Sequence, residues 1–353
     1  MSGFAAALIR WQKAHGRHGL PWQGGRDPYA VWLSEIMLQQ TQVSSVIPYY
    51  QRFLASFPDI ATLAAASQDE VLAHWSGLGY YSRARNLHQA ARQVMERHGG
   101  VFPAEFEQIL ALPGIGRSTA AAISAFAFGM RRAILDGNVK RVLARYFAVA
   151  GYPGEKSIEA LLWLRAEELL PHVGIETYTQ ALMDLGATVC TRGKPACDSC
   201  PVNADCQARQ QGLQAVLPYT RPRKALPERE TTMLLLLREG EIFLEKRPPA
   251  GIWGGMWSFP EIAREEDPQQ ACLASFGFET ETLKPLPHVQ HTFTHFRLHI
   301  LPQPLTVSAL QLRACLAGGM WLSVDDALGA AIPAPVRQLL LLCRKGDAEK
   351  PAD

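Results

Sequence analysis

Two carboxylic acids stand in surroundings that could separate their protonation states. Glu35 lies in the run "VWLSEIMLQQTQV", where its helical neighbours at three and four positions are Val31, Trp32, Leu38 and Gln39. Because burial disfavours the charged form of a carboxyl, this setting would raise the pKa of Glu35 and keep it protonated near neutral pH. The alternative is an edge glutamate whose stem packs while its head reaches water.

Asp136, in "AILDGNVKRV", is the second candidate. The nearby cations that would keep it ionised are Arg131, Arg132, Lys140, Arg141 and Arg145. The alternative is an N-cap aspartate that opens the helix "NVKRVLARY". A protonated acid beside a carboxylate is what cleavage of a glycosidic bond needs, because the acid protonates the leaving group and the anion stabilises the cationic sugar.

Four cysteines are spaced as metal ligands. Cys190, Cys197, Cys200 and Cys206 form the pattern Cys-x6-Cys-x2-Cys-x5-Cys, and Arg192 and Lys194 place positive charge between the first two. Spacing alone leaves zinc and an iron-sulfur cluster open.

The stretch "LPGIGRSTAAA" predicts a tight turn that leads into a helix. Gly114 and Gly116 permit positive φ angles, and the free amides of a helix that begins at Arg117 suit a phosphate. A purely structural turn is the alternative. The polar run after Glu35, which includes Gln40 and Thr41, suits a surface that meets base edges.

Composition places the chain among globular proteins of two or three domains, with 353 residues of which 48% are hydrophobic and 19% charged. The net charge of +2 means that any nucleic-acid footprint is local. The apolar run at the N-terminus is too short for a signal peptide, and no stretch is long enough to span a membrane. We therefore expect a cytosolic protein.

The pattern of apolar residues changes at a proline-rich segment, "LPYTRPRKALPERE". Before it, apolar residues recur at helical spacing; after it, "TTMLLLLREGEIFLEKR" predicts two strands joined by a Glu-Gly turn, and "HTFTHFRLHI" predicts strands. The fold class is a mainly α N-terminal domain followed by an α/β domain. The predicted boundaries are a helical domain at 1–216, a linker at 217–230, an α/β domain at 231–345 and a tail at 346–353.

Together, "WLSEIMLQQTQV", "LPGIGRSTA", "LDGNVKRV" and "CTRGKPACDSCP" with Cys206 resemble the adenine DNA glycosylases of the MutY type, in the helix-hairpin-helix superfamily. The resemblance covers nearly the whole chain. It implies one 4Fe-4S cluster per chain, held in the loop 190–206 by the four cysteines. It also implies that the hairpin from Leu112 to Gly116 binds a DNA phosphate.

The same resemblance assigns roles to individual residues. It implies that Glu35 is the general acid at adenine N7 and that Asp136 stabilises or captures the oxocarbenium-like sugar. Bifunctional relatives have a lysine at the position of Ser118, which forms a Schiff base with the sugar, so this chain should leave the strand intact. Further positions implied near the adenine are Arg26, Asn138 and Gln180, and those implied to enter the duplex are Gln40, Thr41 and Tyr80.

The C-terminal part, with "GIWGGMWSFPE" and "HTFTHF", resembles the MutT-like (Nudix) domain that reads 8-oxoguanine opposite adenine in this family. The stretch "EIAREEDPQQACLASFG" lacks the glutamate spacing of a magnesium-dependent Nudix hydrolase, so we expect a recognition module. Phe293, Thr294 and His295 stand where most relatives have Phe-Ser-His. Neighbouring histidines lie on predicted strands, where they would not converge on a metal.

The predicted reaction is hydrolysis of the N-glycosidic bond of adenine mispaired with 8-oxoguanine or guanine in duplex DNA, by a nucleoid-associated bacterial monomer that binds no membrane. One alternative is an endonuclease III-like glycosylase/lyase, against which Ser118 and the added domain argue. Another is a non-catalytic iron-sulfur DNA-binding protein, against which the pair Glu35 and Asp136 argues.

Overall fold

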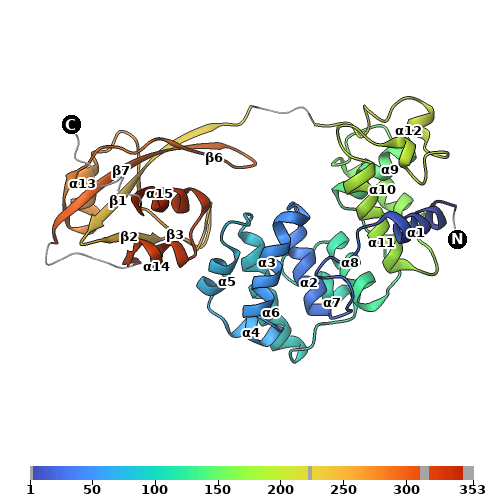
Figure 1. Ribbon diagram of the computed structural model, residues 1–353, viewed down its shortest axis with the longest axis horizontal. Coiled ribbons are helices and arrows are strands. Elements are labelled where there is room, and N and C mark those ends of the chain that lie inside the picture. Colours follow the sequence, from blue (N-terminus) through green and yellow to red (C-terminus); the bar gives the residue numbers. More distant parts are fainter. Residues whose placement is uncertain (1–2, 222–224, 311–317, 345–353) are drawn as a thin grey trace. The chain divides into compact units, whose positions relative to one another are not determined.

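The structure is a computed structural model that describes residues 3–221, 225–310 and 318–344 (Figure 1). The chain divides into two compact units. The first, the helical unit, comprises Met1–Ala65 and Asn86–Arg223. The second, the sheet unit, comprises Ala66–Arg85 and Lys224–Asp353. No helix of the described residues has both the length and the apolar character needed to cross a bilayer.

The helical unit is built from short helices joined by tight turns (Figure 1). They are α1 (Gly3–His15), α2 (Pro28–Leu38), α3 (Val43–Ser56), α4 (Ile60–Ala65), α6 (Ser82–His98, which begins in the other unit), α7 (Phe106–Leu110), α8 (Arg117–Phe128), α9 (Gly137–Tyr146), α10 (Lys156–Glu168), α11 (Ile175–Asp184) and α12 (Gln207–Gln210). A π-helical turn at Leu185–Val189 continues α11, and a 3-10 turn occupies Cys197–Ser199. The helical structure predicted for the chain before the proline-rich segment is confirmed.

Local sequence signals fix where the important helices begin and end. Asp27 accepts hydrogen bonds from the backbone N–H groups of Tyr29 and Ala30, and Pro28 supplies the preset φ of a first helical residue, so α2 begins there. Helix α8 ends at Gly129, whose φ of 65° is the left-handed conformation of a helix C-terminus. These signals set the first residue of α2, the helix that carries Glu35, and the last residue of α8.

One apolar core holds α1, α8, α9, α10 and α11 together. Each helix contributes buried side chains to it, for example Leu8, Ala122, Val142, Leu162 and Tyr178. Cys190 and Cys200 pack against this core from the loop that follows α11. The core therefore anchors α9 and the cysteine loop to the same helices.

The sheet unit contains one mixed sheet and flanking helices. Its elements are α5 (Gln68–Trp75), β1 (Glu228–Arg238), β2 (Glu241–Lys246), β3 (Trp257–Ser258), β4 (Glu261–Ile262), α13 (Pro268–Phe276), β5 (Phe278–Thr282), β6 (Val289–Thr292), β7 (Arg297–Leu310), β8 (Gly319–Ser323), α14 (Val324–Gly329) and α15 (Ala334–Arg344). The strand order is β3-β2-β1-β7-β5, with β4 on β1, β6 on β7 and β8 on β2. Strands β1 and β7 are parallel, and the other pairs of the described strands are antiparallel. The predicted α/β class is confirmed.

Two hairpins match the sequence. Glu239 and Gly240, with φ angles of 51° and 81°, turn β1 into β2, as the Glu-Gly signal predicts. Strands β6 and β7 are joined by a tight loop in which the N–H of Phe293 donates to the carbonyl of Phe296 at 2.9 Å. The predicted recognition residues therefore lie at the tip of a hairpin.

The segment 66–85 groups with the sheet unit, which the sequence did not predict. Asp69 at the start of α5 forms an ion pair with Lys246 at 2.7 Å. The Ser76 hydroxyl donates to the carbonyl of Ile332 at 2.7 Å. These bonds join residues far apart in the chain, so no local pattern reveals them.

Candidate catalytic cleft and cysteine site

A cleft of about 1430 Å³ opens in the helical unit. Its walls come from the end of α2 and the turn that follows, the N-termini of α8 and α9, the turn 152–154 and the segment 215–220. The predicted site residues that line it are Glu35, Gln40, Thr41, Gly116, Ser118, Asp136 and Asn138. Segments more than 100 residues apart therefore meet around one space, as the predicted chemistry requires.

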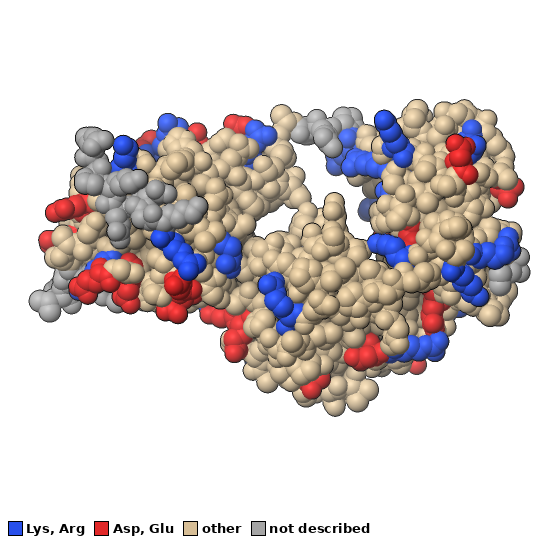
Figure 2. All heavy atoms as spheres, in the orientation of Figure 1, with Lys and Arg blue, Asp and Glu red and all other residues tan. Residues whose placement is uncertain are grey.

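Positive charge predominates around this cleft. Its charged lining residues are the cations Arg17, Lys140, Arg141 and Arg192 and the two acids Glu35 and Asp136. Figure 2 shows one face of the molecule, on which Lys and Arg side chains gather along the edge of the helical unit that carries α9 and α10. A basic cleft attracts a polyanion and keeps its contacts salt-dependent.

Glu35 has a raised pKa in the cleft. Its side chain is half-buried in the last turns of α2. Burial, and to a lesser degree the negative charge of Asp136, raise its pKa to about 8. A carboxyl with this pKa carries a proton at neutral pH and can deliver it to a leaving group. The pKa shift predicted from the apolar helical neighbours is thus confirmed.

Asp136 caps a helix and lines the cleft at the same time. Its carboxylate accepts the backbone N–H of Val139 at 2.7 Å and so begins α9. The N-cap alternative is therefore correct as a structural description, and it is compatible with a role in the cleft.

The surroundings of Asp136 act on its pKa in both directions. Burial raises its pKa, although the N–H groups of Val139 and Asn138 and the charges of Arg141 and Lys140 all act to lower it. The basic neighbours favour the ionised form, as predicted, but desolvation outweighs them. The local sequence shows the cations but not how deeply Asp136 is buried. It therefore could not predict which of the two effects on the pKa is larger.

The hairpin between α7 and α8 has one glycine that its conformation requires. Gly114 has a φ of 79°, and a Cβ there would lie 2.8 Å from the Cβ of Asn86. Gly116, by contrast, has a φ of −93° and is the N-cap of α8, so the expected positive φ is absent there. Leu112 is 2% exposed and packs inside. The turn thus presents backbone rather than the Leu112 side chain.

Ser118 lies at the start of α8 on the cleft wall. Its hydroxyl accepts the backbone N–H of Leu135 at 2.9 Å, so it is tied to the residue that precedes Asp136. A neutral hydroxyl in this position cannot form an imine with an opened sugar.

Gln40 has a strained backbone, with a φ of 57° in the turn between α2 and α3. Its neighbour Gln39 donates to the Gly114 carbonyl at 3.4 Å and to Thr119 Oγ1 at 3.3 Å, which links this turn to the hairpin. Such strain in a non-glycine residue is typical of functional sites. Tyr80 has a similar φ of 50° and is 44% exposed, but it belongs to the sheet unit.

The three residues implied near the adenine are placed differently from one another. Asn138 lines the cleft and accepts a hydrogen bond from Arg141 Nη2 at 2.8 Å. Arg26 forms an ion pair with Glu176 at 2.5 Å, and it is not among the residues that line the cleft.

Gln180 also lies outside the cleft lining. It donates to the buried carboxylate of Asp184 at 2.8 Å, and the same carboxylate pairs with Arg17 at 2.7 Å. Because Arg17 lines the cleft, Gln180 is connected to the cleft through Asp184 and Arg17. The sequence analysis singled out neither of these two residues.

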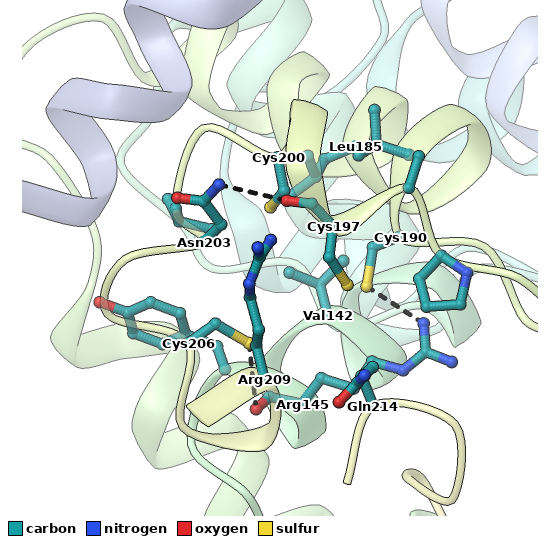
Figure 3. A pocket seen from close by; sticks show the side chains of 15 residues that line it. Val142, Arg145, Leu185, Cys190, Cys197, Cys200, Asn203, Cys206, Arg209 and Gln214 are labelled. Carbon is teal, nitrogen blue, oxygen red and sulfur yellow. Dashed lines mark hydrogen bonds between the residues drawn. The ribbon is translucent and has the colours of Figure 1, made fainter. Parts of the chain in front are cut away.

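The four cysteines surround one small cavity of about 30 Å³ (Figure 3). Arg145 Nη1 donates to Cys190 Sγ at 3.3 Å. Arg209 also lines the cavity, and its Nη1 is buried with no hydrogen-bond partner. Burial raises the pKa of the Cys200 thiol to about 11. All four cysteines therefore line the same cavity as Arg145 and Arg209, although no three of the described His, Cys, Asp or Glu side chains are arranged to hold a metal ion.

The β6–β7 hairpin exposes two of its three predicted recognition residues. Thr294 and His295 are exposed at its tip. Phe293 is half-buried, stacked on Phe296 at a centroid distance of 4.6 Å and 5.3 Å from the ring of Trp253. These ring contacts hold Phe293 against the hairpin.

Comparison with known proteins decides the family. Residues 33–168 match the family described as "HhH-GPD superfamily base excision DNA repair protein", and residues 231–342 match the NUDIX domain. The adenine DNA glycosylase of Buchnera aphidicola is 35% identical over 97% of each chain. That of Homo sapiens is 33% identical over 96% of this chain and 73% of its own. The chain belongs to the adenine DNA glycosylases.

Solved structures agree with this assignment. A thermostable thymine-DNA glycosylase matches 59% of this chain and 95% of its own with a TM-score of 0.54 and 30% identity. A trapped covalent endonuclease III–DNA intermediate matches 60% and 99% with a TM-score of 0.51, but at 19% identity this shows the fold alone. This adenine DNA glycosylase is therefore a base excision repair enzyme that acts on DNA, and the predicted two-part architecture is confirmed.

Proposed function

We propose that this adenine DNA glycosylase hydrolyses the N-glycosidic bond of adenine mispaired with 8-oxoguanine or guanine and leaves the DNA strand intact. The proposal is supported by the pair Glu35 and Asp136 in one basic cleft, where the pKa of Glu35 is raised to about 8. We further propose that it works as a monomer at the bacterial nucleoid and not at a membrane.

The chemistry begins once adenine has left the base stack and entered the cleft. Unstacking costs least at a mispair, which favours the mismatch before any bond breaks. Glu35 then donates its proton to adenine N7, so the base leaves as a neutral molecule. Proton donation of this kind contributes about 10² to 10⁴ in rate.

Asp136 acts on the sugar that remains. As the bond to adenine breaks, positive charge develops on the sugar, and the carboxylate of Asp136 stabilises or captures it. The hydrogen bond from Val139 N–H holds this carboxylate in place at the N-terminus of α9. Ser118 offers no amine, so water completes the hydrolysis and no lyase step follows.

We assign DNA contacts to further residues of both units. The hairpin Leu112–Gly116 binds a backbone phosphate, which fits the left-handed turn at Gly114. Gln40, Thr41 and Tyr80 enter the duplex, which fits the strained backbones of Gln40 and Tyr80. Arg26, Asn138 and Gln180 form and support the adenine pocket. Thr294 and His295 read the opposite base, with Phe293 behind them.

We propose that the cofactor is one 4Fe-4S cluster ligated by Cys190, Cys197, Cys200 and Cys206. Among the described residues, no three His, Cys, Asp or Glu side chains are arranged to hold a metal ion, so the choice of an iron-sulfur cluster over zinc rests on the family and not on the positions of the thiols. The unpartnered donor on Arg209 and the Cys190-bound donor on Arg145 suit an anionic group with sulfur acceptors. When bound, the cluster cross-links the loop 190–206 to the helical core.

The cofactor is tested by metal and sulfide analysis. The purified protein should be brown and contain about four iron and four sulfide per chain. A colourless, zinc-loaded and fully active protein would contradict the assignment.

The function is tested by single-turnover incubation with duplexes that differ at one base pair. Adenine opposite 8-oxoguanine or guanine should be excised, as seen by strand cleavage after alkali and not before it. Adenine opposite thymine should persist. A thymine opposite guanine is included because of the thymine-DNA glycosylase likeness, and its preferential excision would replace the proposed substrate.

A further inference from the structure

Arg145 is a buried cation in the last turn of α9, only 2% exposed. Its Nη1 donates to Cys190 Sγ at 3.3 Å and to the carbonyl of Thr191 at 2.7 Å, and its Nη2 donates to the carbonyl of Arg192 at 3.3 Å. Its Nε donates to the carbonyl of Leu217 at 2.8 Å. The guanidinium therefore touches both the cysteine loop and a segment well beyond it.

The partners of Arg145 satisfy its hydrogen bonds but leave its charge unbalanced. Three of them are neutral carbonyls and one is a thiol, and no carboxylate of the described residues pairs with it. A buried charge without a counter-charge is strongly unfavourable. A cluster ligated by four thiolates is an anion, so its presence in the cysteine cavity would supply the missing charge.

The Leu217 carbonyl belongs to a wall of the catalytic cleft. Residues 215–220 all line that cleft. Leu217 itself is 3% exposed and packs inward, whereas Val216 and Tyr219 on either side are 55% and 46% exposed. Holding the Leu217 carbonyl therefore fixes where the two exposed side chains stand.

We propose that Arg145 is a positioning residue that makes the cleft wall 215–220 depend on the group held by the cysteines. With the cluster bound, the charge of Arg145 is balanced and its guanidinium keeps the hydrogen bond to the Leu217 carbonyl. Val216 and Tyr219 then face the duplex. Without the cluster, the guanidinium is uncompensated and the wall loosens. The inference rests on the proposed iron-sulfur cofactor and on duplex DNA as the substrate.

The test compares Arg145→Gln with Arg165→Gln as a matched control. Arg165 lies on α10, stacks on Phe147 at 4.9 Å and pairs with Glu168, and it lines neither the cysteine cavity nor the cleft. Iron content and visible absorbance are measured first. A parent protein without iron refutes the proposed iron-sulfur cofactor, whereas the role of Arg145 is tested by the measurements that follow. Amide exchange of peptides covering 213–221 and the Kd for an undamaged duplex follow.

For Arg145→Gln that retains its iron, we expect at least tenfold faster exchange in 213–221 and a Kd about tenfold weaker, because a hydrogen bond from a charged donor is lost. The excision rate at saturating protein should fall less than the affinity does. Arg165→Gln should leave the exchange in 213–221 unchanged. Unchanged exchange in Arg145→Gln, or equal effects in both variants, would overturn the proposal.

A second measurement covers an Arg145→Gln protein that does not fold or hold iron. Parent protein is stripped of iron with a chelator, and exchange in 213–221 is compared with exchange in α8. The proposal expects amide exchange in 213–221 to become at least tenfold faster while exchange in α8 is still unchanged. Equal exchange with and without iron refutes it, whatever the excision assay shows.

Discussion

The raised pKa of Glu35 predicts how excision depends on pH. The reaction needs the protonated carboxyl, and burial together with Asp136 puts its pKa at about 8. The acid form is thus fully available well below pH 8 and is lost as the pH rises through it. At pH 7 about nine tenths of the molecules carry the proton, and at pH 9 about one tenth do, so the rate should fall roughly tenfold over this interval.

The assay is single-turnover excision from an adenine:8-oxoguanine duplex between pH 6 and 9.5, at constant ionic strength and with DNA binding checked at each pH. An NMR titration of the Glu35 carboxyl in Asp136→Asn provides a separate readout. Its pKa should be lower than in the parent, because one negative charge is gone, but still above 4.5, because burial is the larger cause. A rate that is constant to pH 9, or a pKa that rises in Asp136→Asn, would refute the reasoning.

Three further variants test other parts of the site. Ser118→Lys should give some strand cleavage and a borohydride-trapped protein–DNA adduct, and no adduct would mean that this position does not face the sugar. Replacing Thr294 and His295 together by alanine should weaken the preference for 8-oxoguanine over guanine about tenfold, since two hydrogen bonds of about 0.5 to 1.5 kcal/mol each are lost; an unchanged ratio of excision rates places lesion reading elsewhere. Gly114→Ala should weaken duplex binding measured by anisotropy more than it lowers the rate at saturation, because it strains a φ of 79°, and unchanged affinity would remove the hairpin from the DNA contact.

Local patterns were sufficient for the fold class and for the chemistry of single residues. The proline-rich segment after Leu217 marks where helical periodicity gives way to strands, and the Glu-Gly turn predicts the β1–β2 hairpin. The apolar neighbours of Glu35 predict its raised pKa because they lie on the same helix. Each of these signals acts within a few residues, which is why a sequence reveals them.

Features that depend on tertiary packing were not predictable in this way. The desolvation of Asp136 comes from walls contributed by distant segments, and it outweighs the cations beside it. The bond between Arg145 and the Leu217 carbonyl joins residues 72 positions apart. The ring contacts that leave Phe293 half-buried come from Phe296 and from Trp253, which lies 40 positions earlier in the chain.

The most direct test of the account is Glu35→Gln, measured for both excision and binding on an adenine:8-oxoguanine duplex. The amide keeps the shape of the side chain and cannot deliver a proton, so single-turnover excision, read after alkali, should be abolished. Affinity for the same duplex should persist, because the basic cleft and the hairpin are intact. Excision at the parental rate by this variant, with binding unchanged, would contradict the assignment of Glu35 as the acid.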